Sequence, residues 1–269
     1  MRAYIMAVIT IGIALGMSLS ALSEENNMSI GPRFQQETCY DSSGLVGKNI
    51  SYGDRTSEYK SYADAKSIKL PSGASGGLSV EEAIHRRKSV RNAADKPLTP
   101  DQLSRLLIAA NGLTHTDSRL THRSIPSAGG LNPLEVYVFI SNVTGLDSGL
   151  YHFKVKDTSL ELIMSGRFSL DLQKAALNQR LESITGAPVA LVIAARFDRS
   201  TQKYADRGYR YIYMEVGCAM QNVYLQATAL GLGTVAVGAF EDNRLNKLLG
   251  LDGQSESALL IMPIGYPAE

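Results

Sequence analysis

The sequence predicts an α+β fold, and two observations support this class. The chain of 269 residues is 44% hydrophobic, with 24 Gly and 9 Pro, which is the composition of an ordinary globular protein. Its apolar segments of strand length and its helical patterns follow one another irregularly, without the regular βαβ order of a barrel and without an internal repeat. A chain of this length suits one domain, or one domain with an extension.

Charge and cysteine content narrow the classes of partner. The 27 Lys and Arg balance the 26 Asp and Glu, and no stretch is strongly basic, so we expect no nucleic acid partner. The two cysteines, Cys39 and Cys218, form no CxxC pair or metal-ligand cluster. We therefore expect no metal site.

The first 23 residues predict export. Arg2 is followed by an uncharged apolar stretch up to Leu22, and Ala21-Leu22-Ser23 resembles the cleavage site of a signal peptide. A retained N-terminal anchor is the alternative, because about 20 apolar residues can span a bilayer. Both interpretations place the rest of the chain in the periplasm or outside the cell, and only the anchor would attach it to a membrane.

Two further parts follow the N-terminal segment. Residues 24–78 are polar and rich in turn residues, and we expect an extension that wraps the domain or tethers it. The domain is expected over residues 79–269. It opens with Ser79 and Glu82, whose spacing forms a capping box for a first helix.

The remaining helices are expected from their caps and apolar stripes. A helix begins at Thr99-Pro100 and ends at Asn111-Gly112. A long helix over 207–230 is apolar on most sides and should lie centrally in the core. A short helix over 241–249 ends at Gly250.

Six apolar segments predict the strands. The segment 187–195 is apolar almost throughout, so we expect it to be buried on both faces. The predicted strands are 135–140, 150–153, 160–163, 187–195, 234–237 and 258–264.

A basic cluster ends the first helix. Arg86-Arg87-Lys88-Ser89-Val90-Arg91 supplies several cations that could converge on a phosphate through charge-assisted hydrogen bonds. The alternative is a basic helix end that only complements the helix dipole.

Two glycine-containing segments could approach a flat ligand. The segment 126–133, Pro-Ser-Ala-Gly-Gly-Leu-Asn-Pro, precedes a predicted strand and leaves backbone amides accessible. The segment 230–240 carries Gly231 and Gly233 at a turn from helix to strand, and Gly238 at the end of that strand. A dinucleotide fingerprint needs strand, turn and then helix, so this order excludes a Rossmann site.

Taken together and in this order, the three motifs resemble the FMN-dependent nitroreductase family over about residues 79–266. More specific matches are similar to its SagB-type branch, the azoline or thiazoline dehydrogenases. They are Glu58-Tyr59-Lys60-Ser61-Tyr62, Gly149-Leu150-Tyr151-His152-Phe153, Lys203-Tyr204, Arg207-Gly208-Tyr209-Arg210-Tyr211 and the segment 217–225.

The resemblance implies a nitroreductase-like fold, with a central mixed or antiparallel sheet flanked by helices. It also implies a homodimer with two FMN sites at the subunit interface. On this basis the flavin phosphate would be held by Arg87, Lys88, Ser89 and Arg91. The ring would be lined from the second subunit by Pro126, Ser127, Ala128 and Gly130, and flavin N5 would face the amides of Gly238 and Ala239.

The sequence departs from the family pattern at two places. Family members often carry a basic residue after the last strand that reaches the phosphate, whereas this sequence ends in Tyr266-Pro267-Ala268-Glu269. We therefore expect phosphate binding to depend more on Arg87, Lys88 and Arg91. The Asn or Ser that the family has in the Pro-Ser loop is replaced by Gly130, which can offer only its backbone.

Lys203-Tyr204 resembles a Lys-Tyr pair that transfers protons in azoline oxidases. A base must remove one proton while the flavin accepts a hydride, and a desolvated Lys can have a pKa suited to this task. The alternative is that Lys203 is a solvated loop residue and that Tyr204 only packs.

These expectations define an FMN-dependent oxidoreductase that moves two electrons, as hydride through flavin N5, to or from an organic substrate. Export favours dehydrogenation of a small molecule or a peptide-derived heterocycle, because NAD(P)H is not expected outside the cytoplasm. One alternative is a nitro- or quinone-reductase with another electron donor. A second is a non-catalytic flavin-binding or partner-binding module.

Overall fold

The computed structural model describes residues 29–41, 44–45, 56–73, 76–94, 96–116, 121–177 and 186–268. The expected signal peptide or anchor, residues 1–23, lies outside the described residues. Contacts divide the chain into two compact units, Met1–Ile50 and Ser51–Glu269. Among the helices described, none is long and apolar enough to cross a membrane.

The first unit contains a short helix and a small hairpin. Helix α2 (Ile30–Glu37) is followed by strands β1 (Tyr40–Asp41) and β2 (Gly44–Leu45), which pair antiparallel. The helix has no buried side chain, and an Arg33–Glu37 ion pair of 3.6 Å lies along its surface.

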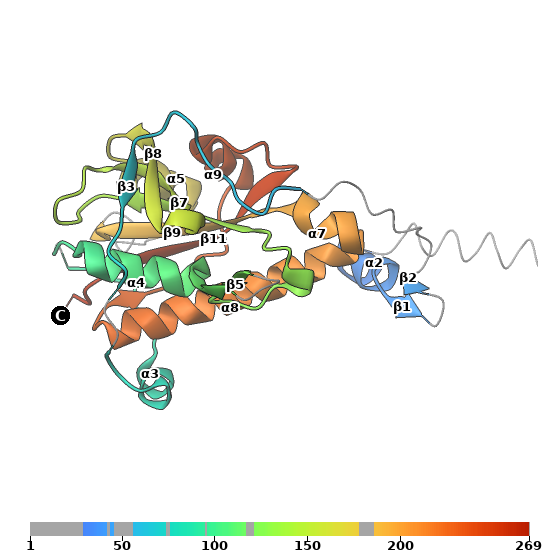
Figure 1. The fold of residues 1–269 in the computed structure, drawn as a ribbon, viewed down its shortest axis with the longest axis horizontal. Coiled ribbons are helices and arrows are strands. Elements are labelled where there is room, and N and C mark those ends of the chain that lie inside the picture. The colour runs from blue at the N-terminus through green and yellow to red at the C-terminus, as the bar shows by residue number, and fades with distance from the viewer. Residues whose placement is uncertain are drawn as a thin grey trace, which may run out of the picture. The chain divides into compact units, whose positions relative to one another are not determined.

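The second unit is built on a seven-stranded antiparallel sheet with the strand order β10-β11-β9-β6-β7-β8-β3 (Figure 1). Its strands are β3 (Ser67–Lys69), β6 (Leu134–Ile140), β7 (Gly149–Lys154), β8 (Ser159–Ser165), β9 (Val189–Arg196), β10 (Gly233–Thr234) and β11 (Glu256–Gly265). The strands β6 and β9 at its centre are buried on both faces, as the continuous apolar run of β9 predicts.

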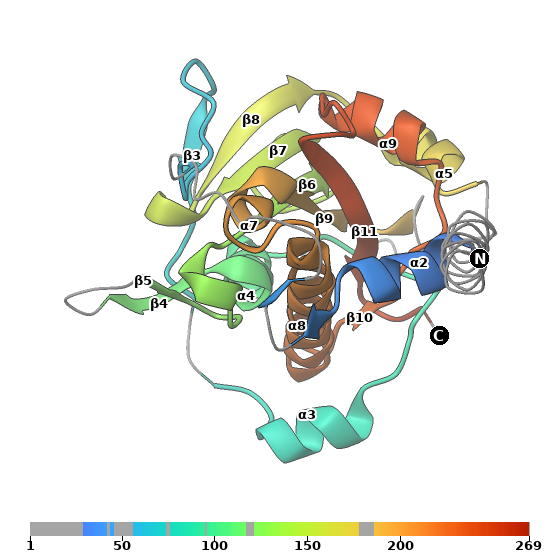
Figure 2. The ribbon, with the colours of Figure 1, turned by 90° about the vertical axis from the view of Figure 1, so that its right-hand side faces the viewer.

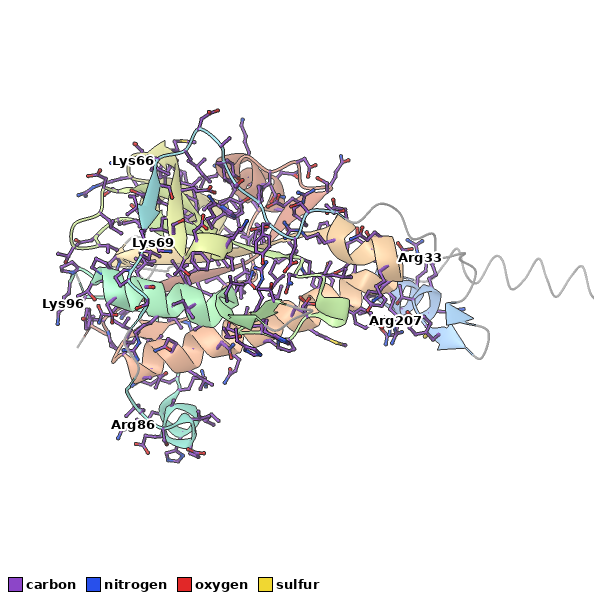
Figure 3. The ribbon with its side chains drawn as sticks, in the orientation of Figure 1. Arg33, Lys66, Lys69, Arg86, Lys96 and Arg207 are labelled. Atoms are coloured by element: carbon purple, nitrogen blue, oxygen red, sulfur yellow. The ribbon has the colours of Figure 1, made fainter. Side chains whose placement is uncertain are left out.

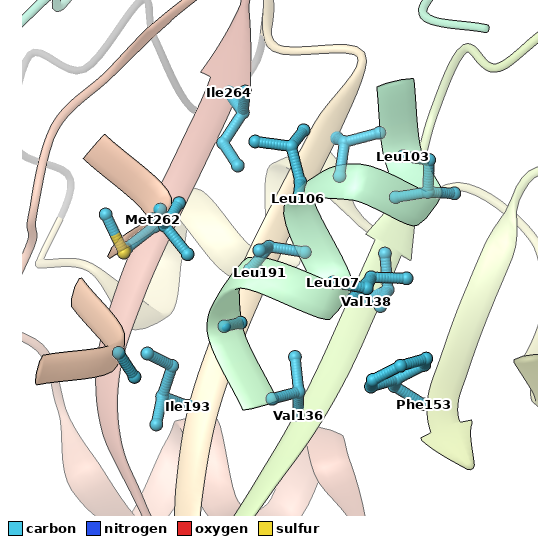
Figure 4. Packing of buried hydrophobic residues seen from close by; sticks show 14 of the residues in the cluster. Leu103, Leu106, Leu107, Val136, Val138, Phe153, Leu191, Ile193, Met262 and Ile264 are labelled. Carbon is cyan, nitrogen blue, oxygen red and sulfur yellow. The ribbon is translucent and has the colours of Figure 1, made fainter. Parts of the chain in front are cut away.

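Helices cover both faces of this sheet. The helices α4 (Pro100–Asn111) and α8 (Arg207–Ala229) lie on one face, and α5 (Ser169–Ala175) and α9 (Asp242–Leu249) lie on the other (Figures 1 and 2). Successive strand residues alternate between the two layers: Val136 and Val138 pack with α4 and α8, whereas Tyr137 and Phe139 pack with α5 and α9. Figure 4 shows the leucines of α4 against the central strands. The predicted α+β class is confirmed.

The helix boundaries follow the predicted caps closely. The Thr99 side chain accepts from the amide of Gln102, and the Gln102 side chain accepts from the amide of Thr99, which completes the capping box of α4. Ser79 caps α3 (Val80–Arg86) by accepting the amide of Glu82. The reciprocal bond of the predicted capping box is absent among the described residues, because the Glu82 carboxylate pairs with Arg86 instead. Gly250 ends α9 with a φ of 72°.

The predicted strand over 234–237 is shorter in the structure. β10 contains only Gly233 and Thr234, and Val237 pairs with Ile261 through an isolated bridge. The interruption has a local cause, because the amide of Ala236 donates to the hydroxyl of Tyr224 instead of to a neighbouring strand.

Residues 56–62, here called the strap, are built into the second unit. The Lys60 ammonium lies 2.7 Å from Glu256 on β11 and 2.6 Å from the Tyr137 hydroxyl on β6. The amide of Tyr62 donates to Glu161 on β8. Part of the predicted polar extension is therefore joined to the sheet by specific polar contacts.

Candidate active site

The basic segment lies beside α8. The guanidinium of Arg87, the residue that caps α3, is 5.2 Å from the centre of the Tyr224 ring. The Ser89 hydroxyl is 3.1 Å from the Tyr224 hydroxyl, which accepts from the amide of Ala236 at 2.8 Å. Tyr224 thus connects the basic segment to the glycine-containing segment that follows α8.

The glycine at position 233 allows this approach. A Cβ on Gly233 would lie 2.5 Å from the Cβ of Val90, so only glycine leaves room for the basic segment here. The amide of Val90 donates to the carbonyl of Thr234, which fixes the two segments side by side. Gly238 and Ala239 follow in the same segment and are exposed.

The charges of this segment are available for an anion. Lys88 and Arg91 are exposed, and Arg87 is half-buried. None of the three forms an ion pair with an acidic residue in the described part of the chain. Nearby, the Thr234 hydroxyl is buried and has no hydrogen-bond partner among the described residues. We call the predicted residues of these two adjoining segments the basic half-site: Arg87, Lys88, Ser89, Arg91, Gly238 and Ala239.

The Pro-Ser loop is held by a residue that the sequence motifs do not indicate. Glu215 of α8 accepts the Ser127 hydroxyl at 3.1 Å and the Ala128 amide at 2.9 Å through a single oxygen, Oε1. The loop then turns through one 3-10 turn, η1 (Ala128–Gly130), in which Gly129 and Gly130 have φ of 62° and 64°. These left-handed angles explain why glycine occupies both positions.

Lys203 and Tyr204 lie against this loop. They form the last turn of α7 (Phe197–Tyr204), and both are half-buried. A Cβ added to Gly129 would lie 2.7 Å from the Tyr204 hydroxyl and 2.8 Å from the Lys203 ammonium nitrogen. The structure therefore places the pair on a helix and not on a solvated loop. The loop half-site comprises Pro126, Ser127, Ala128, Gly130, Lys203 and Tyr204.

The two half-sites are separated along α8. Glu215 anchors one and Tyr224 the other, and nine residues of α-helix correspond to roughly 13 Å. In Figure 3, Arg86 on α3 and Arg207 at the start of α8 lie far apart. Near the loop half-site, Tyr213 and Met214 of α8 remain 52% and 65% exposed.

A second set of contacts fixes the far end of the Pro-Ser loop. Asn132, which has a positive φ of 49°, donates from its side chain to Glu58 of the strap at 2.9 Å. Arg199 of α7 donates to the carbonyls of Asn132 and Ser57. The strap, the loop and α7 are thereby joined around one buried guanidinium.

Arg199 also belongs to a buried row of charges on the sheet. It lies 2.7 Å from Glu135, whose other oxygen is 2.8 Å from His152, and His152 contacts Glu161 at 2.9 Å on its opposite nitrogen. Burial acts to raise the pKa of Glu135, but the His152 hydrogen bond and the Arg199 charge outweigh it and lower that pKa. The row joins α7 to the neighbouring strands β6, β7 and β8. Elsewhere, the His115 and His122 rings stack with their centres 4.2 Å apart in the hairpin of β4 (Leu113–Thr116) and β5 (Thr121–Arg123).

Comparison with known proteins agrees with this arrangement. The sequence model of the nitroreductase family matches residues 84–266, which make up well over half of the chain. The chain belongs to the nitroreductase family. The protein MJ1384 of Methanocaldococcus jannaschii, which is described as a nitroreductase, is 42% identical to this chain over 206 residues. The matched region covers 77% of this chain and 99% of MJ1384.

The relatives of this chain include peptide-processing proteins, in agreement with the predicted resemblance to the SagB-type branch. The microcin B17-processing protein McbC of Escherichia coli is 27% identical over 179 residues, which cover 65% of each chain. A solved structure from Anabaena variabilis, described as a nitroreductase, shares the fold with a TM-score of 0.68 and 24% identity. That comparison covers 90% of this chain but only 52% of the other, so the chain spans about half of its length.

Family membership makes the chain a flavin-dependent oxidoreductase, and the basic half-site suits such a cofactor. Three cations there have no acidic partner among the described residues, and a buried hydroxyl, that of Thr234, has no described partner either. Charge-assisted donors of this kind hold phosphate groups. His, Cys, Asp and Glu side chains form no group suited to a metal ion within the described segments.

Proposed function

We propose that this nitroreductase-family enzyme binds FMN and acts as a two-electron dehydrogenase on a small or peptide-derived organic substrate, in its exported form. The observation that supports this most strongly is the packing of Lys203 and Tyr204 against Gly129 of the Pro-Ser loop. When bound, the flavin supplies hydride chemistry at N5. The chain supplies a base and a hydroxyl at the loop half-site, where a substrate proton can be accepted or returned.

We also propose a homodimer in which each active site combines the basic half-site of one subunit with the loop half-site of the other. Two facts support this. The half-sites of a single subunit are separated along α8, and the large side chains Tyr213 and Met214 are exposed on the same helix. An isologous interface over α8 would cover them and create two equivalent shared sites.

Flavin content tests the first part of this proposal. The purified chain should show the two visible absorption bands of oxidised flavin, and FMN should be released on heating. The double variant Arg87→Ala/Arg91→Ala should lose the flavin while keeping its fold. Arg86→Ala is the matched control, because Arg86 pairs with Glu82 on the exposed face of α3, and it should retain the flavin. Release of FAD, or a colourless protein that takes up no FMN, would overturn the proposal.

Mixing two inactive variants tests the shared site. Arg87→Ala/Arg91→Ala lacks a working basic half-site, and Lys203→Ala lacks a working loop half-site. After subunit exchange, half of the dimers should be mixed, and each mixed dimer should contain one intact site, so about a quarter of the sites should work. Single-turnover reduction of the flavin by an added thiazoline or dihydroquinone measures this fraction. If both half-sites served the same subunit, mixing would restore nothing.

The direction of the reaction is part of the proposal. If the chain is exported as its N-terminal segment predicts, a nicotinamide donor is absent and substrate oxidation is favoured. Rapid and saturable oxidation of NADPH by the purified enzyme would instead support the nitro- or quinone-reductase alternative.

A further inference from the structure

Glu215 is an acidic residue in an otherwise apolar part of α8. It is 4% exposed, and its helical neighbours Ile212, Val216 and Ala219 belong to the main core cluster. Acidic side chains are rarely buried unless they are paired. Among the described residues the charge of Arg123 acts on Glu215 without forming an ion pair, and its second oxygen, Oε2, has no hydrogen-bond partner.

The hydrogen bonds that Glu215 accepts from described residues both come from the Pro-Ser loop. Oε1 accepts both the Ser127 hydroxyl and the Ala128 amide, and the Ser127 oxygen in turn accepts the amide of Asn132 at 2.9 Å. One carboxylate oxygen therefore ties together the start and the end of the loop.

The loop between these contacts depends on such an anchor. Gly129 and Gly130 adopt positive φ readily, but Asn132 is a non-glycine residue with a φ of 49°, a conformation that persists only where surrounding contacts hold it. Gly129 directly follows Ala128, the residue held by Glu215. Gly129 is also the residue against which the Lys203 ammonium and the Tyr204 hydroxyl pack.

We propose that Glu215 is a positioning residue of the active site, which holds the Ser127–Gly130 turn in place so that Lys203 and Tyr204 are correctly aimed. This inference rests on the proposed role of that pair. Glu215 itself does not touch the reacting atoms. A Gln side chain retains an acceptor oxygen at the same place, whereas Ala removes it.

Amide hydrogen exchange of the full-length chain tests the proposal directly. Glu215→Ala should speed exchange at Ala128 by about tenfold, as the loss of one buried hydrogen bond predicts. Glu215→Gln should leave it within a few-fold of the unmodified chain. If Glu215→Ala does not fold, Ser127→Ala provides a second route, because it removes the link from Glu215 to Asn132 and should speed exchange at Asn132.

The orientation of Lys203 beside Tyr204 is tested by a second measurement. Amine-directed labelling of Lys203, followed by mass spectrometry, should change in rate in Glu215→Ala and return to normal in Glu215→Gln. Exposed Lys247 serves as the internal reference in each sample. Unchanged exchange at Ala128 together with unchanged labelling of Lys203 would overturn the proposal. Both measurements are made without flavin and repeated with added FMN, so failure to bind FMN would refute the proposed function but not the role of Glu215.

Discussion

Gly129 and Tyr204 are in such close contact that a single methyl group would not fit between them. A Cβ built on Gly129 would lie 2.7 Å from the Tyr204 hydroxyl and 2.8 Å from the nitrogen of Lys203. Both neighbours are the far ends of flexible side chains, so they could move aside without disturbing the core. The loop and the Lys-Tyr pair can therefore be uncoupled by mutation while the fold is kept.

We expect Gly129→Ala to lower turnover by tenfold or more while flavin remains bound, because the new methyl group displaces Lys203 and Tyr204. Its stability should fall by about 1 kcal/mol, from the positive φ alone. Gly231→Ala is the matched control. Gly231 has a φ of 70° but nothing within 4 Å of an added Cβ, so it should show the same loss of stability without the loss of turnover. Equal turnover in the two variants would contradict the arrangement.

The Tyr224 hydroxyl offers a test of the basic half-site. Tyr224→Phe keeps the ring beneath Arg87 but removes the link between Ser89 and the amide of Ala236. Flavin affinity should fall about tenfold, as for the loss of one or two hydrogen bonds. Tyr151→Phe, which removes only a hydrogen bond to the Asp147 carbonyl, should lower stability without weakening flavin binding. Flavin titration by fluorescence distinguishes the two.

Glu215 should give the protein a dependence of stability on pH. Burial raises the pKa of this carboxyl from its ordinary 4.5 to about 7, although hydrogen bonds from the loop and the charge of Arg123 oppose the shift. The native protein then binds the proton more tightly than the unfolded chain does, so stability is lost as the pH rises from about 5 to 8. The loss is at most about 3 kcal/mol.

Glu215→Gln isolates this contribution. The free energies of unfolding of the variant and the unmodified chain, measured by denaturant titration, should differ increasingly in favour of the variant between pH 5 and pH 8. Parallel curves over this range would show that the carboxyl does not titrate there.

Lys60→Met should destabilise the second unit by about 3 kcal/mol, because it leaves the nearly buried carboxylate of Glu256 without its cation. The double variant Lys60→Met/Glu256→Gln should recover part of this loss, since no unpaired charge remains. The denaturation midpoints of the two variants measure the difference. A double variant less stable than the single one would argue against a charge-pair origin.

Local signals in the sequence predict most of the elements. The start of α4 at Thr99-Pro100, the apolar run of β9 and Gly250 after α9 each depend on neighbouring residues only, and each is confirmed. Glu215 is different, because its partners Ser127 and Ala128 are 88 and 87 positions away. An acidic residue inside an apolar helix indicates a buried polar contact, but this local pattern does not identify the loop that the residue contacts.

The contacts of the strap could not be predicted from the sequence for the same reason. Lys60 and Arg199 are ordinary polar residues in their local sequence, and only the folded sheet brings them to Glu256, Ser57 and Asn132. The assignment of flavin-binding and proton-transferring roles to the two half-sites stays a prediction that the variants above can decide.

The strap also has a consequence for biosynthesis. Lys60 emerges early from the ribosome, whereas its partner Glu256 is made 196 positions later. At 5–20 residues per second, the strap must wait roughly 10 to 40 s before its ion pair can form. During this time Lys60 and Tyr137 lack the carboxylate that joins them. The strap can therefore form its ion pair only after β11 has been synthesised. In a nascent chain interrupted before β11, the strap would remain accessible to proteases and chaperones.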